Sequence, residues 1–167
     1  MVGNLAGQKE KSLNALSMSP EASDALHRSA DELPWVDMGG SNMMRVAYVD
    51  PGEGLWIVQN IFQAGFEVLT HRHTGPVFGY TISGAWKYKE YDYVNRAGSF
   101  LYEPAGSVHT LECIEDDTLA WFHMSGSNLN LDADGEIVSV TDGMGSLQAY
   151  YESCEAQGLP RPNVIVR

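Results

Sequence analysis

The sequence predicts an all-β fold in which short antiparallel strands form a sandwich or a barrel. Between residues 43 and 140, short segments rich in Val, Ile, Tyr, Phe and Trp are separated by turn residues, which is the pattern of strands and turns. About ten such segments at close spacing are typical of sandwiches and barrels. With 167 residues, of which 44% are hydrophobic and 19% charged, the chain fits one globular domain.

Residues 1–34 precede this strand-rich region and are rich in Ser, Ala, Asn and Glu. Ser19, Pro20 and Glu21 are typical of a helix start, because Ser caps a helix, Pro suits its first turn and an acid suits its positive end. We expect a tail and one short helix that runs through Leu26 and ends before Pro34. A plain linker is the alternative.

Turn residues divide residues 35–145, the expected barrel, into its strands. Segments 51–54 and 132–135 contain the Pro, Gly and Asp residues that tight turns require. The expected strands are 43–50, 55–63, 66–73, 77–83, 86–91, 99–103, 108–114, 118–125, 129–131 and 136–140.

Residues 146–167 are expected to form a terminal helix and a tail packed on the barrel. Within 146–158, four side chains recur at the spacing of one helix face. They are Leu147, Tyr150, Tyr151 and Cys154. Gly158 and the Pro that follows it indicate the end of this helix.

The charge balance excludes several classes of partner. Ten basic residues against 22 acidic residues give a net charge of −12, so we expect neither nucleic-acid binding nor docking on anionic lipid. No apolar run reaches 18 residues, and the first thirty residues lack the apolar core of a signal peptide. Two cysteines cannot build a disulfide framework. We therefore expect a cytoplasmic protein.

Three histidines are the strongest functional signal. His71 and His73 flank Arg72, and side chains two positions apart on a strand project to the same face. His109 follows a Pro-x-Gly turn on a later expected strand, where it can complete a metal site. Neutral imidazole suits Fe, Zn, Cu and Ni. The sequence thus predicts one metal ion bound by His71, His73 and His109.

Glycines and a proline surround these histidines in two blocks. The blocks are Gly65-x5-His71-x-His73-x10-Gly84 and Gly98-x5-Pro104-x-Gly106-x2-His109. In spacing and order they resemble the two motifs of the cupin family, with close similarity over residues 65–125. The resemblance implies a jelly-roll β-barrel.

The departures from the cupin motifs define the expected chemistry. Val77 and Phe78 stand where the first motif usually carries a Glu ligand, and Cys113 stands where the second usually carries Asn. The chain is therefore similar to the three-histidine cupin dioxygenases, such as the acetylacetone and 2,4'-dihydroxyacetophenone dioxygenases, and looks closer to the second. This resemblance implies Fe(2+), with Zn(2+) as an alternative in isolated protein. It also implies O2, a hydroxyketone or diketone substrate and a homodimer or homotetramer.

Electrostatics favours the same substrates, because three neutral imidazoles leave the full double charge on the ion. An anionic, chelating enolate suits such an ion. We expect an iron-dependent dioxygenase that cleaves an aromatic hydroxyketone into an aromatic carboxylate and formate. A hydrolase or isomerase using the same site is an alternative. So is a regulatory zinc-binding cupin of the anti-sigma type, although only about 34 residues precede the barrel, with His27 as their sole candidate ligand.

Glu103, six positions before His109, is the candidate catalytic residue. In the cupin family an acid there can approach the metal pocket, where it would hydrogen-bond a ligand or accept a substrate proton. The alternative is a solvated acid at a strand end.

Other polar and aromatic residues are expected to be structural. We expect Cys113 to be a small pocket liner, Arg96 to cap a loop and His123 to be buried and hydrogen-bonded. Inward positions on the strand 77–83 are Val77, Gly79 and Thr81, whose small side chains leave a cavity. Five aromatic residues are expected in the core, with the pocket as the alternative: Tyr80, Trp86, Tyr93, Trp121 and Phe122.

Overall fold

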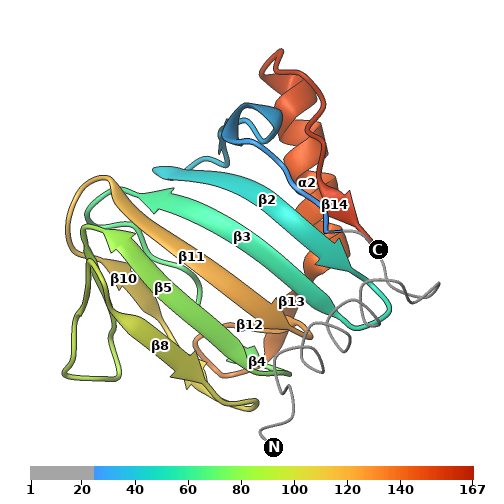
Figure 1. Ribbon diagram of the computed structural model, residues 1–167. Coiled ribbons are helices and arrows are strands. Elements are labelled where there is room, and N and C mark those ends of the chain that lie inside the picture. The colour runs from blue at the N-terminus through green and yellow to red at the C-terminus, as the bar shows by residue number, and fades with distance from the viewer. Residues whose placement is uncertain (1–24) are drawn as a thin grey trace, which may run out of the picture.

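The computed structural model describes residues 25–167 (Figure 1). Most of the expected N-terminal helix, residues 19–24, lies outside the described residues. Residues 25–29 have no regular structure, and the first helical turn is the 3-10 helix η1, Ala30–Glu32. Its start is capped because the Glu32 carboxylate accepts a hydrogen bond from the backbone N–H of Ser29.

Fourteen strands make up a little under half of the described chain and form three sheets. The strands are β1 Val36–Asp37, β2 Asn42–Asp50, β3 Leu55–Phe62, β4 His71–His73, β5 Val77–Ser83, β6 Ala85–Tyr88, β7 Asn95–Arg96, β8 Phe100–Glu103, β9 Val108–His109, β10 Leu111–Cys113, β11 Thr118–Ser125, β12 Asn128–Leu131, β13 Ile137–Thr141 and β14 Ile165–Val166. The large sheet has the order β1-β2-β3-β11-β5-β8, with β14 parallel to β2. The smaller sheets are β10-β6-β7 and β13-β12-β4-β9.

The large sheet lies in front of the two smaller sheets in Figure 1, and apolar side chains fill the space between them. Trp56 and Val58 on β3, and Phe122 and Met124 on β11, are buried in this core with Trp86 from β6. The expected all-β barrel is confirmed. Alternation along β11 places every second residue inside, as the sequence pattern predicts.

Three expected strands are wrong in their extent, one of them 86–91, which ends early at Tyr88 in β6. Segment 66–73 is a strand only at β4, because Phe66 and Val68 bond to the backbone of β10 while β4 pairs with β9 and β12. Because the first half of the segment bonds to β10 and the second half to β9 and β12, it does not form one continuous strand. Segment 108–114 divides into β9 and β10 at Thr110, whose N–H donates to the Glu90 carboxylate.

Gly84, a motif glycine, ends β5 in the left-handed region with φ of 74°. A Cβ there would collide with Thr118 at the start of β11. Glycine is required at this corner for both reasons.

The helix α2, Gly143–Ala156, packs against β1, β2 and β3 at one end of the large sheet (Figure 1). It begins three residues before the expected start, because Asp142 is its N-cap and accepts a hydrogen bond from the N–H of Gly145 at 2.7 Å. Of its predicted buried face, Leu147, Tyr150 and Cys154 are buried.

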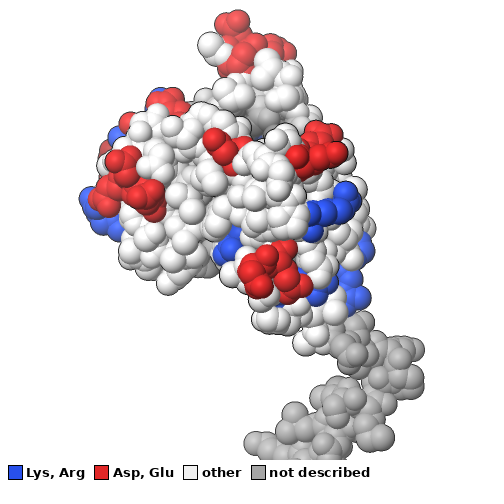
Figure 2. Space-filling view, turned by 90° about the horizontal axis from the view of Figure 1, so that it is seen from above, with Lys and Arg blue, Asp and Glu red and all other residues white. Residues whose placement is uncertain are grey.

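The surface carries the acidic excess in separate groups. Figure 2 shows clusters of Asp and Glu side chains on the viewed face with Lys and Arg side chains between them. No helix within residues 25–167 has the length and apolarity needed to cross a membrane.

Candidate metal centre

The three predicted ligands meet inside the barrel. His71 and His73 lie on β4, and β9 pairs with β4 so that His109 is directly opposite His71. All three are buried, with exposed fractions of 5%, 3% and 1%. One nitrogen atom from each ring lies within 4.8 Å of the others. Strand pairing thus brings His109 next to two histidines that lie far before it in the chain, His73 being 36 residues away.

His71 is held in the form that a metal ligand requires. Its Nδ1 lies 2.7 Å from the backbone oxygen of Leu69. A carbonyl oxygen only accepts hydrogen bonds, so Nδ1 carries the proton and Nε2 keeps its lone pair free for an ion. Burial lowers the pKa of His71 to about 4, so the ring is neutral at pH 7.

Nitrogen and oxygen atoms from three other side chains, those of His73, His109 and Glu103, converge on the same buried point. The Nε2 atoms of His73 and His109 are 2.9 Å apart. Glu103 Oε2 lies 2.6 Å from the first and 3.1 Å from the second, yet neither approach has the angles of a hydrogen bond. A buried carboxylate oxygen without a donor is costly unless a cation balances it. This donor set therefore fits a divalent metal ion.

Glu103 lies on β8 with an exposed fraction of 3%, so it is not a solvated acid at a strand end. Burial by itself raises the pKa of this carboxyl, but interactions with the imidazoles of His109 and His73 outweigh it and lower the pKa to about 2. The carboxylate is therefore ionised at neutral pH. The expectation that the ion keeps its full double charge is therefore wrong, because this negative charge partly balances the ion.

Tyr88 on β6 is part of the site and was missed by the sequence analysis. Its hydroxyl donates a hydrogen bond of 2.5 Å to Glu103 Oε1, and its ring stacks on that of His109 at 3.7 Å between centroids. Burial, with the nearby Glu103 charge, raises the pKa of Tyr88 well above its usual value, so it remains a donor. The sequence contained one signal for Tyr88. It lies two positions after Trp86, so the alternation of a strand places both side chains on the same buried face.

A cavity of about 170 Å³ adjoins these groups. Apolar side chains form most of its wall, including Val58, Phe122 and Met124, and Asn60 adds an amide. A cavity of about 150 Å³ holds a benzene molecule, so this one accommodates a single ring or a small aliphatic chain. Of the small inward residues expected to leave this space, Val77 lines the cavity, but Gly79 lies against Phe122 and Thr81 bonds to the Trp86 indole, so neither of these two lines it.

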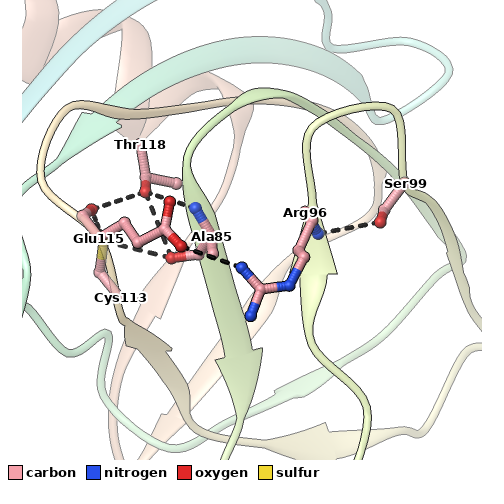
Figure 3. Close-up of polar contacts among 6 residues, drawn as sticks. All are labelled: Ala85, Arg96, Ser99, Cys113, Glu115 and Thr118. Atoms are coloured by element: carbon pink, nitrogen blue, oxygen red, sulfur yellow. Dashed lines mark hydrogen bonds and ion pairs between the residues drawn. The ribbon is translucent and has the colours of Figure 1, made fainter.

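Neither Cys113 nor Arg96 lines the cavity. Both belong to a separate group of polar contacts, which Figure 3 shows. The Cys113 thiol donates to the backbone oxygen of Glu115, whose carboxylate pairs with the Arg96 guanidinium at 2.9 Å. Figure 3 also shows the Arg96 N–H bonded to Ser99, so Arg96 closes the turn, as expected. Cys113 is buried in the core and not in the cavity wall, which corrects its expected role.

Four aromatic or histidine side chains differ from expectation. Trp86 and Phe122 are core residues as predicted, but Tyr80, Tyr93 and Trp121 are exposed. His123 is half-buried on the outer face of β11 beside the Phe78 ring, so the prediction of a buried histidine is wrong. Adjacent strands place their outward residues side by side, and that outer face is aromatic.

Comparison with known proteins places this geometry in a family. Residues 23–128 match the model of the ChrR cupin-like domain. No curated protein matches the chain. A cupin crystal structure from Ralstonia eutropha, described as RmlC-like, is 30% identical, with 85% of this chain and 94% of that chain covered and a TM-score of 0.78.

Two solved structures with described functions share the fold at lower identity. An acetylacetone dioxygenase from Acinetobacter johnsonii is 15% identical, with 81% of this chain and 95% of that chain covered and a TM-score of 0.70. The Rhodobacter sphaeroides complex of SigE with the anti-sigma ChrR contains a chain that is 18% identical, with coverage of 75% and 70% and a TM-score of 0.50.

Proposed function

The chain belongs to the family of ChrR cupin-like domains, and from this premise we propose that it is an iron-dependent dioxygenase. The proposed substrate is an aromatic hydroxyketone, which reacts with one O2 to give an aromatic carboxylate and formate. The observation that supports it is the cluster of His71, His73 and His109 beside an ionised carboxylate, at the wall of an apolar cavity of ring size.

His71, His73 and His109 would hold the iron. Iron(II) bound there supplies the redox chemistry that a reaction with O2 requires and that zinc lacks. The protein contributes neutral imidazoles, because burial disfavours the protonated form of His71 and the Leu69 carbonyl fixes its tautomer.

Glu103 is the group placed to handle a proton. Its Oε2 faces the point where the imidazoles converge, and its Oε1 is held by Tyr88. A hydroxyketone must lose a proton to become an enediolate, and Glu103 is in position to receive it. A pKa of about 2 makes this carboxylate a weak base, so its role combines proton acceptance with orientation of the substrate hydroxyl.

The cavity wall would select the substrate. Apolar side chains favour a ring over a charged group, and the small volume favours a single ring. An aliphatic diketone would also fit this space, and it remains the alternative substrate of the same reaction type. We propose that the enzyme acts in the cytoplasm, in agreement with its two free, buried cysteines.

One combined experiment tests the reaction. Metal content is measured on protein purified without added metal, and O2 uptake is followed with an aromatic hydroxyketone, an aliphatic diketone and matched ketones that cannot enolise. We expect one O2 consumed per molecule cleaved, with one labelled oxygen atom from ¹⁸O2 in each product. Label from water, or equal activity with Zn(II), would overturn the dioxygenase proposal in favour of a hydrolase.

A regulatory metal-binding cupin is the second candidate function. The family match to the ChrR cupin-like domain favours it, since a solved ChrR chain is an anti-sigma factor in complex with a sigma factor. In that case the purified protein would hold zinc, consume no O2 with any ketone and bind a sigma factor in a pull-down. The two functions are thus separated by metal identity and O2 uptake.

A further inference from the structure

The outer face of β5 and β8 carries large apolar side chains where a sheet facing water usually carries polar ones. Phe78, Tyr80 and Ile82 on β5 have exposed fractions of 40%, 48% and 42%. Phe100 and Tyr102 on β8 have exposed fractions of 68% and 56%. We call these five residues, together with Trp121 on β11, the aromatic face.

Strand register makes this face continuous. Tyr80 pairs with Phe100 on one side and with Trp121 on the other, which forms one row across three strands. The next row contains Phe78 between Tyr102 and His123. The Phe78 ring lies 5.4 Å from that of Tyr102 and 6.1 Å from that of Phe100. Figure 1 shows the three strands side by side, away from α2.

No Asp, Glu, Lys or Arg occupies an outward position of β5 or β8, nor of β11. The chain as a whole has a net charge of −12. Two copies that approach through this face keep their acidic side chains apart, whereas most other faces would bring like charges together. A charge-free patch on an acidic protein is therefore suited to a second copy of the same chain.

The area of the aromatic face also approaches that of a dimer interface. The six exposed fractions add up to about three fully exposed side chains, or roughly 600 Å² at ~200 Å² for each aromatic residue. A stable interface buries about 800 Å² per partner, and the largest apolar patch of a typical monomer is about 300–600 Å². The rim around six central side chains can supply the rest.

We propose that the aromatic face is the interface of a homodimer. A two-fold axis places the same patch against itself, and two sheets packed face to face interdigitate their side chains at a spacing of ~10 Å. The inner face of the same strands remains free to line the cavity. This assignment is independent of the proposed reaction, because it uses only outward side chains.

Sedimentation equilibrium of the full chain, from about 1 to 100 µM, tests the interface. We expect wild-type protein to sediment at twice the chain mass of 18.3 kDa. The double variant Phe100→Lys/Tyr102→Lys places four charges in the dimer interface and should sediment as a monomer. Both positions are exposed in the single chain, so the thermal midpoint of the variant monomer should stay close to that of dissociated wild-type protein.

A matched control uses two exposed apolar residues on another strand. Val138 and Val140 on β13 are also two positions apart, with exposed fractions of 56% and 57%. Val138→Lys/Val140→Lys should remain dimeric. A wild-type monomer at 100 µM overturns the proposal, and so does a dimer that only the β13 variant dissociates.

Discussion

The two faces of β8 carry opposite kinds of side chain. Phe100 points outward and is 68% exposed, whereas Glu103, three residues later, points inward and is 3% exposed. Hydrophobicity by itself predicts the reverse. The inner face contributes an acid to the histidine cluster, and the outer face presents aromatic rings to solvent. Burial on β8 therefore follows from how the strands pair. Positions where an acid is buried or an aromatic ring is exposed indicate sites of interaction.

The largest expected effect is on the metal, and it compares two histidines on opposite faces. His109→Ala removes one of three ligands and should abolish most metal content, as should His71→Ala and His73→Ala. His123→Ala on the outer face is the matched control and should keep full occupancy. Elemental analysis of dialysed protein measures both, and equal metal loss in the two variants would contradict the assigned ligands.

Glu103→Gln tests whether the buried acid acts in turnover. The amide keeps the shape of the carboxylate but accepts no proton, so we expect metal to remain bound and turnover to fall roughly 10- to 100-fold. The control is Glu112→Gln, since Glu112 pairs with Lys87 at the surface. Steady-state O2 uptake measures the rates. A wild-type rate at full metal occupancy would assign Glu103 a purely structural role.

Tyr88→Phe removes the hydroxyl that holds Glu103 Oε1 while keeping the ring stacked on His109. A hydrogen bond to a buried charge contributes about 1.5–3 kcal/mol, so the free energy of unfolding should fall by about 2 kcal/mol. Urea titration measures this change. Tyr80→Phe on the outer face is the control and should be nearly neutral; similar losses in both variants would remove the distinction between the faces.

The smallest expected effect compares neighbours on β5. Buried Thr81 Oγ1 accepts a hydrogen bond of 2.9 Å from the indole of Trp86. Thr81→Val removes this hydrogen bond between neutral groups and should cost about 1 kcal/mol. Ile82→Val, one residue away on the outer face, should cost less, because it removes one methyl group and breaks no hydrogen bond. Thermal unfolding measures the stability loss of each variant. Equal midpoints would count against the role of this hydrogen bond.

Much of the barrel could be predicted from local pattern. The segments 77–83 and 118–125 are observed as β5 and β11 with the expected bounds, because alternation and turn residues are local properties. The spacing of His71 and His73 places them on one face of any strand. The sequence by itself therefore determined the fold class and the candidate ligands, with His109 identified through the motif spacing.

Only the tertiary structure decided which face of each strand is inside when both faces are apolar. Trp121 is as hydrophobic as a core residue, and its hydrophobicity does not indicate that it points outward. For Tyr80, the inward set on the strand 77–83 already implied the outer face, although its hydrophobicity favoured the core. The pairing of β5 with β8 directs Glu103 inward, and the packing of β6 against β10 brings Tyr88 to His109. These contacts join residues distant in sequence, so periodicity gives the alternation of a strand but not the partner that each face meets.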